Sequence, residues 1–276
     1  LLTTFKSLSQ SITINKDHIA QGEKLLEAYF SPMAECFGAS LNNGWYNTAK
    51  PHKLGGFDIT ITASVVLVPE AKKTFNISDY GGATFSNNGI NTTPSILGKA
   101  KGTAGTEVIY HDPNGDKQFF MPDGLDISFV PLPMMQAGIG LIKGTELNVR
   151  YIPEREIGNA GKIALFGLGI KHDILQWIPI AENIPIDLSI QTGYTNLRSE
   201  IKLSESNQNE EAITNSEVSA MTINILLSKK LLIFTPYIGI GYNSTNTIFN
   251  IKGDYNIAGL TIDASELTEI KLKSKT

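Results

Sequence analysis

The sequence predicts an all-β protein: an antiparallel transmembrane β-barrel with an N-terminal helical hatch. The first observation is alternation. In residues 57–68, FDITITASVVLV, the odd positions are apolar and most even positions are polar, as in a β-strand with two unlike faces. The second observation is that this pattern recurs, in segments close to the roughly 10 residues that a tilted strand needs to cross a bilayer.

Six further segments repeat the alternation: 137–141, 146–151, 164–171, 184–194, 220–228 and 232–243. Weaker candidates lie at 247–253 and 260–273. The face opposite the apolar one carries mostly Ser, Thr, Asn, Gln and Gly, whereas the outer face of a soluble sandwich is usually rich in Lys and Glu. Such a face suits a semi-polar barrel lumen, so we expect the apolar residues of 57–68 to face lipid and Asp58, Thr60 and Thr62 to face the lumen.

Composition is compatible with this interpretation. The chain has 276 residues and a net charge of −4, so nothing favours a polyanionic partner, and we expect no binding to nucleic acid. No apolar run approaches a transmembrane helix. The chain opens without the basic and apolar regions of a signal peptide, as a processed N-terminus would. The single cysteine, Cys36, excludes an internal disulfide and is expected to be a small core residue.

Residues 17–41 form the one strongly helical stretch, with apolar side chains at three- and four-residue spacing. Ser31 and Pro32 match a helix cap and first position, so two short helices are predicted, the second ending at Gly38. The stretch is either a helix packed on a core or a plug in a barrel mouth. The expected division is a helical hatch over residues 1–50 and an outer-membrane barrel over 51–276.

Two segments are expected to be loops. Residues 69–133 show little alternation and contain Gly-Gly, Asn-Gly and several prolines, including Pro131 and Pro133, which are turn signals. Residues 204–215, SESNQNEEAITN, are uniformly polar. Shorter connections, such as 228–230, lie between other strands, and alternation of long and short connections is typical of membrane barrels.

Catalytic and metal-binding motifs are weak or missing. Asp112, Asn114, Asp116 and Asp123 match part of a calcium-loop template, but Lys117 stands where the template needs glycine, so a solvated turn is the better interpretation. The four histidines lack metal-ligand spacing. No nucleophile, phosphate or dinucleotide motif is found. We therefore expect neither an enzyme nor a cofactor or metal site.

Three segments resemble a family of Bacteroidota outer-membrane proteins: FGASLNNGWYNTAKPHKLGGFDITI at 37–61, GTELNVRYIP at 144–153 and GKIALFGLGIKHDILQWIP at 161–179. Their layout is similar to the long-chain fatty-acid transporter class, which has a helical hatch inside the barrel and more than ten strands. The resemblance implies that Asn42, Asn43, Trp45, His52 and Lys53 lie at the junction between hatch and first strand and face the lumen. Barrels of this kind end in an aromatic strand, whereas this chain ends in KLKSKT, so closing strands beyond this sequence are expected.

Three functions fit these expectations. The first is an outer-membrane barrel that binds or passively takes up a small hydrophobic molecule, with Phe119, Phe120, Met121, Phe129, Met134 and Met135 as a surface for that ligand. The second is a non-transporting barrel that serves as a subunit or docking platform in an outer-membrane secretion or gliding complex. The third is a soluble lipid-binding β-protein. The expected partners are outer-membrane lipid and, according to the function, the hydrophobic ligand or the protein complex.

Overall fold

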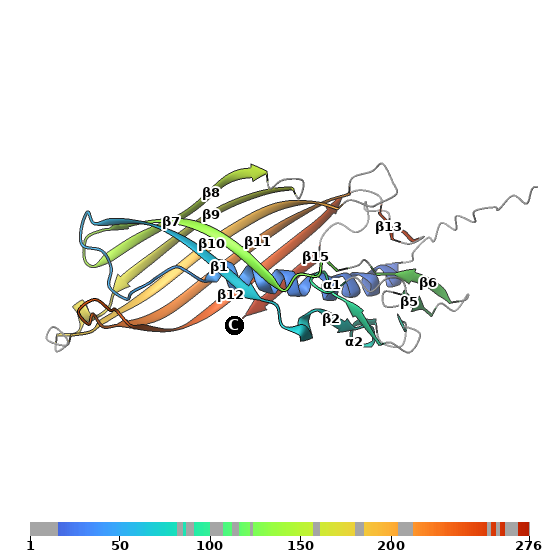
Figure 1. The fold of residues 1–276 in the computed structure, drawn as a ribbon, viewed down its shortest axis with the longest axis horizontal. Coiled ribbons are helices and arrows are strands. Elements are labelled where there is room, and N and C mark those ends of the chain that lie inside the picture. Colours follow the sequence, from blue (N-terminus) through green and yellow to red (C-terminus); the bar gives the residue numbers. More distant parts are fainter. Residues whose placement is uncertain are drawn as a thin grey trace, which may run out of the picture.

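The computed structural model describes residues 16–81, 85–86, 91–99, 107–111, 116–121, 124–156, 161–179, 185–203, 212–252, 255–257, 260–262 and 270–275. One antiparallel sheet of eight strands dominates, in the order β1-β7-β8-β9-β10-β11-β12-β15, and it curls into a half-barrel (Figure 1). Its strands are β1 Phe57–Leu67, β7 Phe129–Gly140, β8 Thr145–Glu156, β9 Gly161–Asp173, β10 Asp187–Leu203, β11 Ala212–Ser228, β12 Tyr237–Lys252 and β15 Ile270–Lys275.

The predicted two-faced character of the strands is confirmed, with the apolar face outward. Ile59 and Ile61 are 70% and 79% exposed, whereas Ser64 of the same strand and Gln136 of β7 are buried. In β7 exposed and buried residues alternate along all 12 positions. The convex face is therefore apolar, and polar side chains gather on the concave face. A soluble half-barrel buries its apolar face instead.

One long helix, α1 Lys16–Asn42, replaces the two short helices predicted from Ser31 and Pro32. Pro32 lies inside it, where proline removes one helical hydrogen bond and clashes with the preceding turn. Packing outside the helix keeps it continuous, because Tyr29, Phe30 and Met33 on either side of Pro32 pack in the main apolar core. The carbonyl of Tyr29 also accepts a hydrogen bond of 3.1 Å from the N–H of Ile96. The prediction of a break at Pro32 was wrong because it considered only local preferences.

Gly38 does not end the helix. A Cβ atom at this position would lie 2.6 Å from Oγ1 of Thr245 on β12, so glycine allows the helix to approach the sheet closely. The helix contacts strands from both halves of the sheet, including β1, β7, β10, β11, β12 and β15. The helix thus lies on the concave face of the half-barrel (Figure 1).

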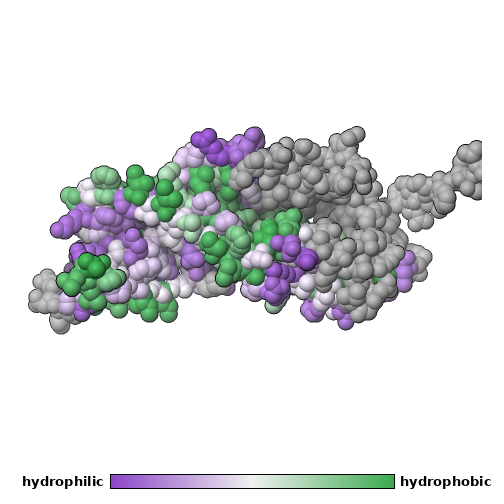
Figure 2. Space-filling view, in the orientation of Figure 1, coloured by the Kyte–Doolittle hydropathy of each residue, from purple (hydrophilic) through white to green (hydrophobic). Residues whose placement is uncertain are grey.

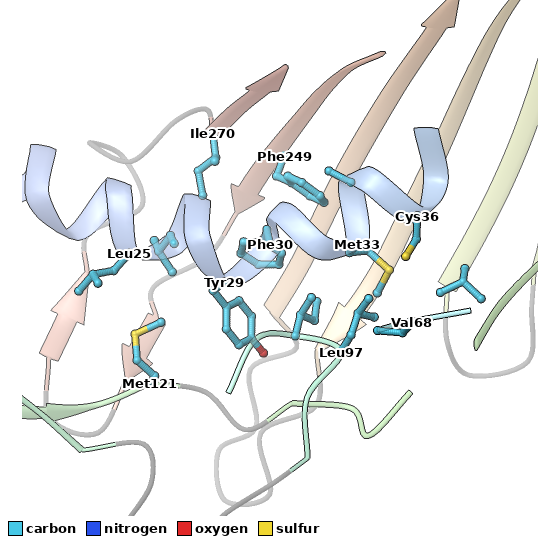
Figure 3. Packing of buried hydrophobic residues seen from close by; sticks show 14 of the residues in the cluster. Leu25, Tyr29, Phe30, Met33, Cys36, Val68, Leu97, Met121, Phe249 and Ile270 are labelled. Carbon is cyan, nitrogen blue, oxygen red and sulfur yellow. The ribbon is translucent and has the colours of Figure 1, made fainter. Parts of the chain in front are cut away.

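The main apolar core joins α1 to one end of the sheet (Figure 3). Leu25, Tyr29, Phe30 and Met33 of the helix pack there, with the ring of Phe30 stacked on that of Phe249 at 4.8 Å between centroids. Short elements between β1 and β7 cover this end: η1 Glu70–Lys72, β2 Thr74–Asn76, α2 Ile77–Gly81, β3 Phe85–Ser86, β4 Thr92–Pro94, β5 Glu107–Tyr110 and β6 Lys117–Phe120. The predicted loop 69–133 is therefore partly structured.

Two prolines predicted to mark a loop lie within a strand. Pro131 and Pro133 belong to β7, opposite Val65 and Ala63 of β1. β7 pairs with β8 only from Gln136 onward, so these prolines face no β8 partner, and a proline is tolerated where a ladder is unpaired. Residues 212–215, also predicted to be a loop, belong to β11, and 204–211 lie outside the described residues.

The C-terminal elements also differ from the prediction. Residues 232–236 form no strand, and β12 begins at Tyr237 and continues through the weaker candidate at 247–253. The candidate at 260–273 corresponds to β14 Leu260–Ile262, which pairs with β13 Tyr255–Ile257, and to β15. β15 pairs with β12 only along Ser244–Phe249. Among the described strands, β1 and β15 are free edges, so the sheet is an open half-barrel, and the closing strands remain a prediction.

Candidate functional site

Strand register arranges the concave face near the C-terminal end of α1 in rows that run across the sheet. The first row holds two charged residues, Glu146 and Lys171, next to Gln191 and Asn224. The second row contains three glycines and lies one pleat further along the strands. Its members are Asp58, Gly138, Asn148, Gly169, Gly193, Thr222 and Asn243. The third row includes Thr60, Gln136, Arg150 and Thr195.

Trp45 fills the space that the glycines leave. It lies in the connection between α1 and β1, residues 43–56, and is 1% exposed. A Cβ atom on Gly169 would lie 2.6 Å from Cζ3 of the indole, and one on Gly193 would overlap Cε2. The indole therefore lies against the bare backbone of two neighbouring strands, and any larger residue at these positions would displace it.

Arg150 holds the other face of this tryptophan. Its guanidinium carbon lies 3.7 Å from the centroid of the Trp45 ring, at the distance of a cation–π contact. The guanidinium donates hydrogen bonds to the carbonyl oxygens of Leu41 and Asn43, at 2.8 and 2.7 Å, and to Oε1 of Gln136 at 2.9 Å. One buried side chain of β8 thus ties down the end of α1 and the start of the connection.

Glu146, also on β8, makes a second link between the sheet and the connection after α1. Its Oε1 lies 3.0 Å from Nζ of Lys171, and both side chains are 3% exposed. Its Oε2 accepts a hydrogen bond from the backbone N–H of His52 and lies near Nδ1 of that residue, both at 2.8 Å. Removing a buried charge from such a pair is costly, because the remaining charge lacks both water and partner.

The side-chain amides of Asn148 and Gln136 join these two sets of hydrogen bonds into one network. Asn148 donates to Oε1 of Glu146 at 3.1 Å, and Gln136 donates to Oδ1 of Asn148 at 3.1 Å and to the carbonyl of Trp45 at 3.4 Å. We call the continuous set of six side chains the lock, since it joins the sheet to the segment lying on it. Its members are Trp45, Gln136, Glu146, Asn148, Arg150 and Lys171.

The residues that the sequence suggested lie around the lock. Asn42 donates to Oγ1 of Thr245, and Asn43 contributes its carbonyl to Arg150. Asp58 lies 3.8 Å from the ring of His52 and accepts a hydrogen bond from Thr60. Thr62 lies beside Gly44, and Lys53 is exposed. The structure brings most of the predicted set together, and a role in ligand binding remains a prediction.

The site residues predicted from the sequence did not include Gln136, Glu146, Asn148, Arg150 or Lys171. A signal was present: all but Gln136 stand at polar positions of predicted strands, and charges are uncommon there. Of the six residues suggested as a ligand surface, the four whose side chains are described do not form one surface. Met121 and Met134 are buried in separate cores, whereas Phe129 and Met135 are exposed. The side chains of Phe119 and Phe120 lie outside the described residues.

A separate cavity of about 360 Å³ lies between the middle of α1 and the elements η1, β2 and α2. Pro32, Lys72, Phe75 and Tyr80 line it, together with Ala28, Ser31, Ala71, Thr74, Asn76 and Asp79. Within the described residues, no group of three or more His, Cys, Asp or Glu side chains is placed to hold a metal ion. Asp112, Asn114 and Asp123 of the calcium-like segment lie outside them.

The fold and the lock define a curved antiparallel half-barrel with its N-terminal helix on the concave face. The chain belongs to a family of unknown function, DUF6588, which it matches over residues 1–276. No curated protein and no solved structure matches it. None of the helices in the described part of the chain is long and apolar enough to cross a membrane.

Proposed function

We propose that this protein is a bacterial outer-membrane β-barrel whose convex face contacts lipid. The exposed apolar face supports the proposal. Outward residues of β1, β9, β11 and β12 remain 38–79% exposed, among them Ile59, Ile61, Phe166, Leu168, Ile223, Ile225, Ile238 and Ile240. Monomeric soluble proteins rarely expose contiguous apolar surface on this scale, and a soluble lipid-binding β-protein would place these side chains inside.

Within that class, the geometry favours a closed docking platform in an outer-membrane complex over a pore. The observation that carries this conclusion is the lock, because Trp45 and Arg150 fill the concave face where a passage would run. A hydrophobic molecule crossing there would have to pass Glu146 and Lys171 and break several buried hydrogen bonds. Uncompensated loss of such bonds costs about 1–3 kcal/mol for each group.

Passive uptake or binding of a small hydrophobic molecule is the second candidate. The cavity of about 360 Å³ beside α1 favours it, since its volume lies within the ordinary range for small-molecule sites and Phe75 and Tyr80 form an edge-to-face pair in its wall. In this case the ligand would bind at the capped end of the sheet, and passage would require displacement of the hatch.

Three measurements separate these functions. The protein should require detergent to remain monodisperse, and monodisperse protein without detergent would contradict the membrane proposal. In liposomes, the intact protein should give no flux of a fluorescent fatty acid above empty vesicles, whereas Trp45→Ala with Arg150→Ala should open a leak. Flux through the intact protein that the variant does not increase would favour uptake, and stable co-purification of an outer-membrane protein complex would favour the platform.

A further inference from the structure

The turn between β11 and β12 exposes four consecutive large apolar residues, Leu231–Phe234. The N–H of Leu231 donates to the carbonyl of Phe234 at 2.7 Å and the reverse bond is 2.8 Å, so the turn is tight. Leu232 and Ile233 at its tip are 94% and 88% exposed. Tight hairpin turns normally carry glycine, asparagine or aspartate.

Leu232 is also in an unfavourable conformation, with φ of +53°. Bulky residues rarely adopt positive φ, and such strain costs about 1–3 kcal/mol and concentrates at functional positions. Because the Leu232 side chain is exposed, no burial against the rest of the described chain offsets this strain. Leu232 therefore combines an exposed large apolar side chain with an unfavourable backbone conformation. Both features are expected of a turn that contacts a partner outside the chain.

Other connections at the same end of the sheet share this character. The antiparallel register places the β7–β8 turn, the β9–β10 connection, the β11–β12 turn and the start of β1 at one end. Gln176 joins two of them by donating to the carbonyl of Lys143 at 2.8 Å. We call their exposed apolar residues the rim: Leu54, Leu141, Ile142, Trp177, Ile178 and Leu231–Phe234. Figure 2 shows hydrophobic side chains gathered at this end, on the left.

Positive charge surrounds the rim. Lys50, Lys53, Lys143, Lys229 and Lys230 are exposed on the same connections. Three described aspartates at this end are already engaged. Asp187 lies 3.7 Å from Lys50, Asp173 accepts a hydrogen bond from the N–H of Leu175, and Asp58 accepts one from the hydroxyl of Thr60. The apolar rim also continues the convex face, because Phe57 of β1 and Ile238 of β12 are exposed beside it. Apolar side chains with flanking lysines complement the boundary between acyl chains and anionic headgroups.

We propose that the rim is an interfacial anchor that inserts Leu232 and Ile233 among the acyl chains near the headgroups, while Lys229 and Lys230 bind anionic phospholipid. This proposal rests on the proposed membrane location. It adds how deep the rim lies in the bilayer and which class of lipid it binds. Insertion buries the apolar tip that the chain leaves exposed, and this burial compensates the strain at Leu232.

The depth is tested in vesicles with lipids brominated near the headgroup or deep in the acyl chain. The native Trp177 is replaced by Phe, and a reporter is introduced as Ile233→Trp or, near the middle of β1, Ile61→Trp. Trp45 is 1% exposed and provides a constant background. We expect shallow bromines to quench the Ile233→Trp reporter most strongly, and deep bromines the Ile61→Trp reporter.

The outcomes distinguish the two proposals. Quenching at Ile61→Trp without quenching at Ile233→Trp would overturn the anchor and leave the membrane location intact. No quenching at either position would overturn both. An Ile233→Trp reporter that is shielded from lipid only when another protein co-purifies would assign the rim to a protein partner and overturn the anchor.

The lipid class is tested with Trp177 as reporter, in vesicles that carry bromines either on phosphatidylglycerol or on phosphatidylcholine. We expect stronger quenching by the brominated phosphatidylglycerol. In Lys229→Gln with Lys230→Gln this preference should fall, by up to about fivefold for each lysine. Lys271→Gln on β15 is the matched control, because it removes a positive charge outside the rim, and it should leave the preference unchanged. An unchanged preference in the double variant would overturn the role of the lysines.

A final variant separates anchoring from folding. Leu232→Gly with Ile233→Ser relieves the positive φ and removes the apolar tip, since glycine adopts this conformation freely. We expect unchanged or higher thermal stability in detergent, together with weaker quenching of Trp177 by shallow bromines. Leu125→Ser, at an exposed leucine of the opposite end, should change neither. Unchanged quenching in the double variant would overturn the anchor.

Discussion

The guanidinium of Arg150 lies over the indole of Trp45, 3.7 Å from the ring centroid, and both residues are 1% exposed. One belongs to a strand of the sheet and the other to the connection that follows the helix. The same guanidinium reaches the carbonyl of Asn43, 107 residues away in sequence. The contact therefore joins the connection after α1 to the concave face of the sheet, and the stability of this arrangement should depend on it.

Arg150→Met should loosen the hatch, because methionine keeps much of the volume but donates no hydrogen bonds to Leu41, Asn43 and Gln136. Hydrogen bonds to a charged group contribute about 1.5–3 kcal/mol each, so we expect a loss of about 3 kcal/mol or more in free energy of unfolding. Chemical unfolding in detergent measures it. Arg198→Met is the control: its side chain is 74% exposed, so the change should stay within about 0.5 kcal/mol. Equal effects of the two variants would contradict the role of Arg150.

Gly193→Ala should displace the indole of Trp45, because the added Cβ overlaps the ring. Overpacking of this kind typically costs about 1–3 kcal/mol. Unfolding measurements and the emission spectrum of Trp45, recorded in a Trp177→Phe background, would both report the change. Thr192→Ala, on the exposed face one residue before, should have little effect. Trp45→Phe should partly rescue Gly193→Ala, and absence of any coupling would show that the glycine is required for another reason.

Much of the sheet could be predicted from the sequence, because period-two alternation reports which face of a strand a residue occupies. Ile59 and Ile61 are exposed as that pattern indicates, and Arg150 lies on the polar face. The contact between Arg150 and Trp45 could not be predicted, since it depends on strand register and on the path of residues 43–56. No local pattern encodes either of them.

The errors have a common physical origin. Pro32 lies inside a helix because the residues on either side of it pack in the main core, and Pro131 lies inside a strand because β8 does not pair with it. In both cases contacts with a segment distant in the sequence determine whether the proline is tolerated, and a local preference does not contain that information. The turn at Leu232 was assigned to a strand because its apolar residues continued the alternation of β12.

Glu146→Gln should destabilise the fold by about 3–5 kcal/mol, since it leaves the buried ammonium of Lys171 without its counter-charge. A matched neutral pair, Glu146→Gln with Lys171→Met, should recover most of that loss, because no isolated charge then remains buried. Unfolding of the single and double variants measures the coupling. Glu217→Gln, at a half-exposed carboxylate, is the control. A double variant less stable than Glu146→Gln alone would show that Lys171 stabilises the lock without Glu146.

The thiol of Cys36 provides a direct probe of hatch opening. Burial raises its pKa, the adjacent Glu35 adds to the rise and Lys72 opposes it, so the reactive thiolate is scarce at neutral pH. The residue is 6% exposed on the helix face that packs in the main core. Alkylation in native protein should be at least about 100-fold slower than at Lys50→Cys in a Cys36→Ser background, because it requires an opening of about 3 kcal/mol. Arg150→Met should accelerate labelling of Cys36 and leave the rate at the exposed cysteine unchanged. Native labelling as fast as at Lys50→Cys would mean that the hatch is open in solution, and the closed platform would then be wrong.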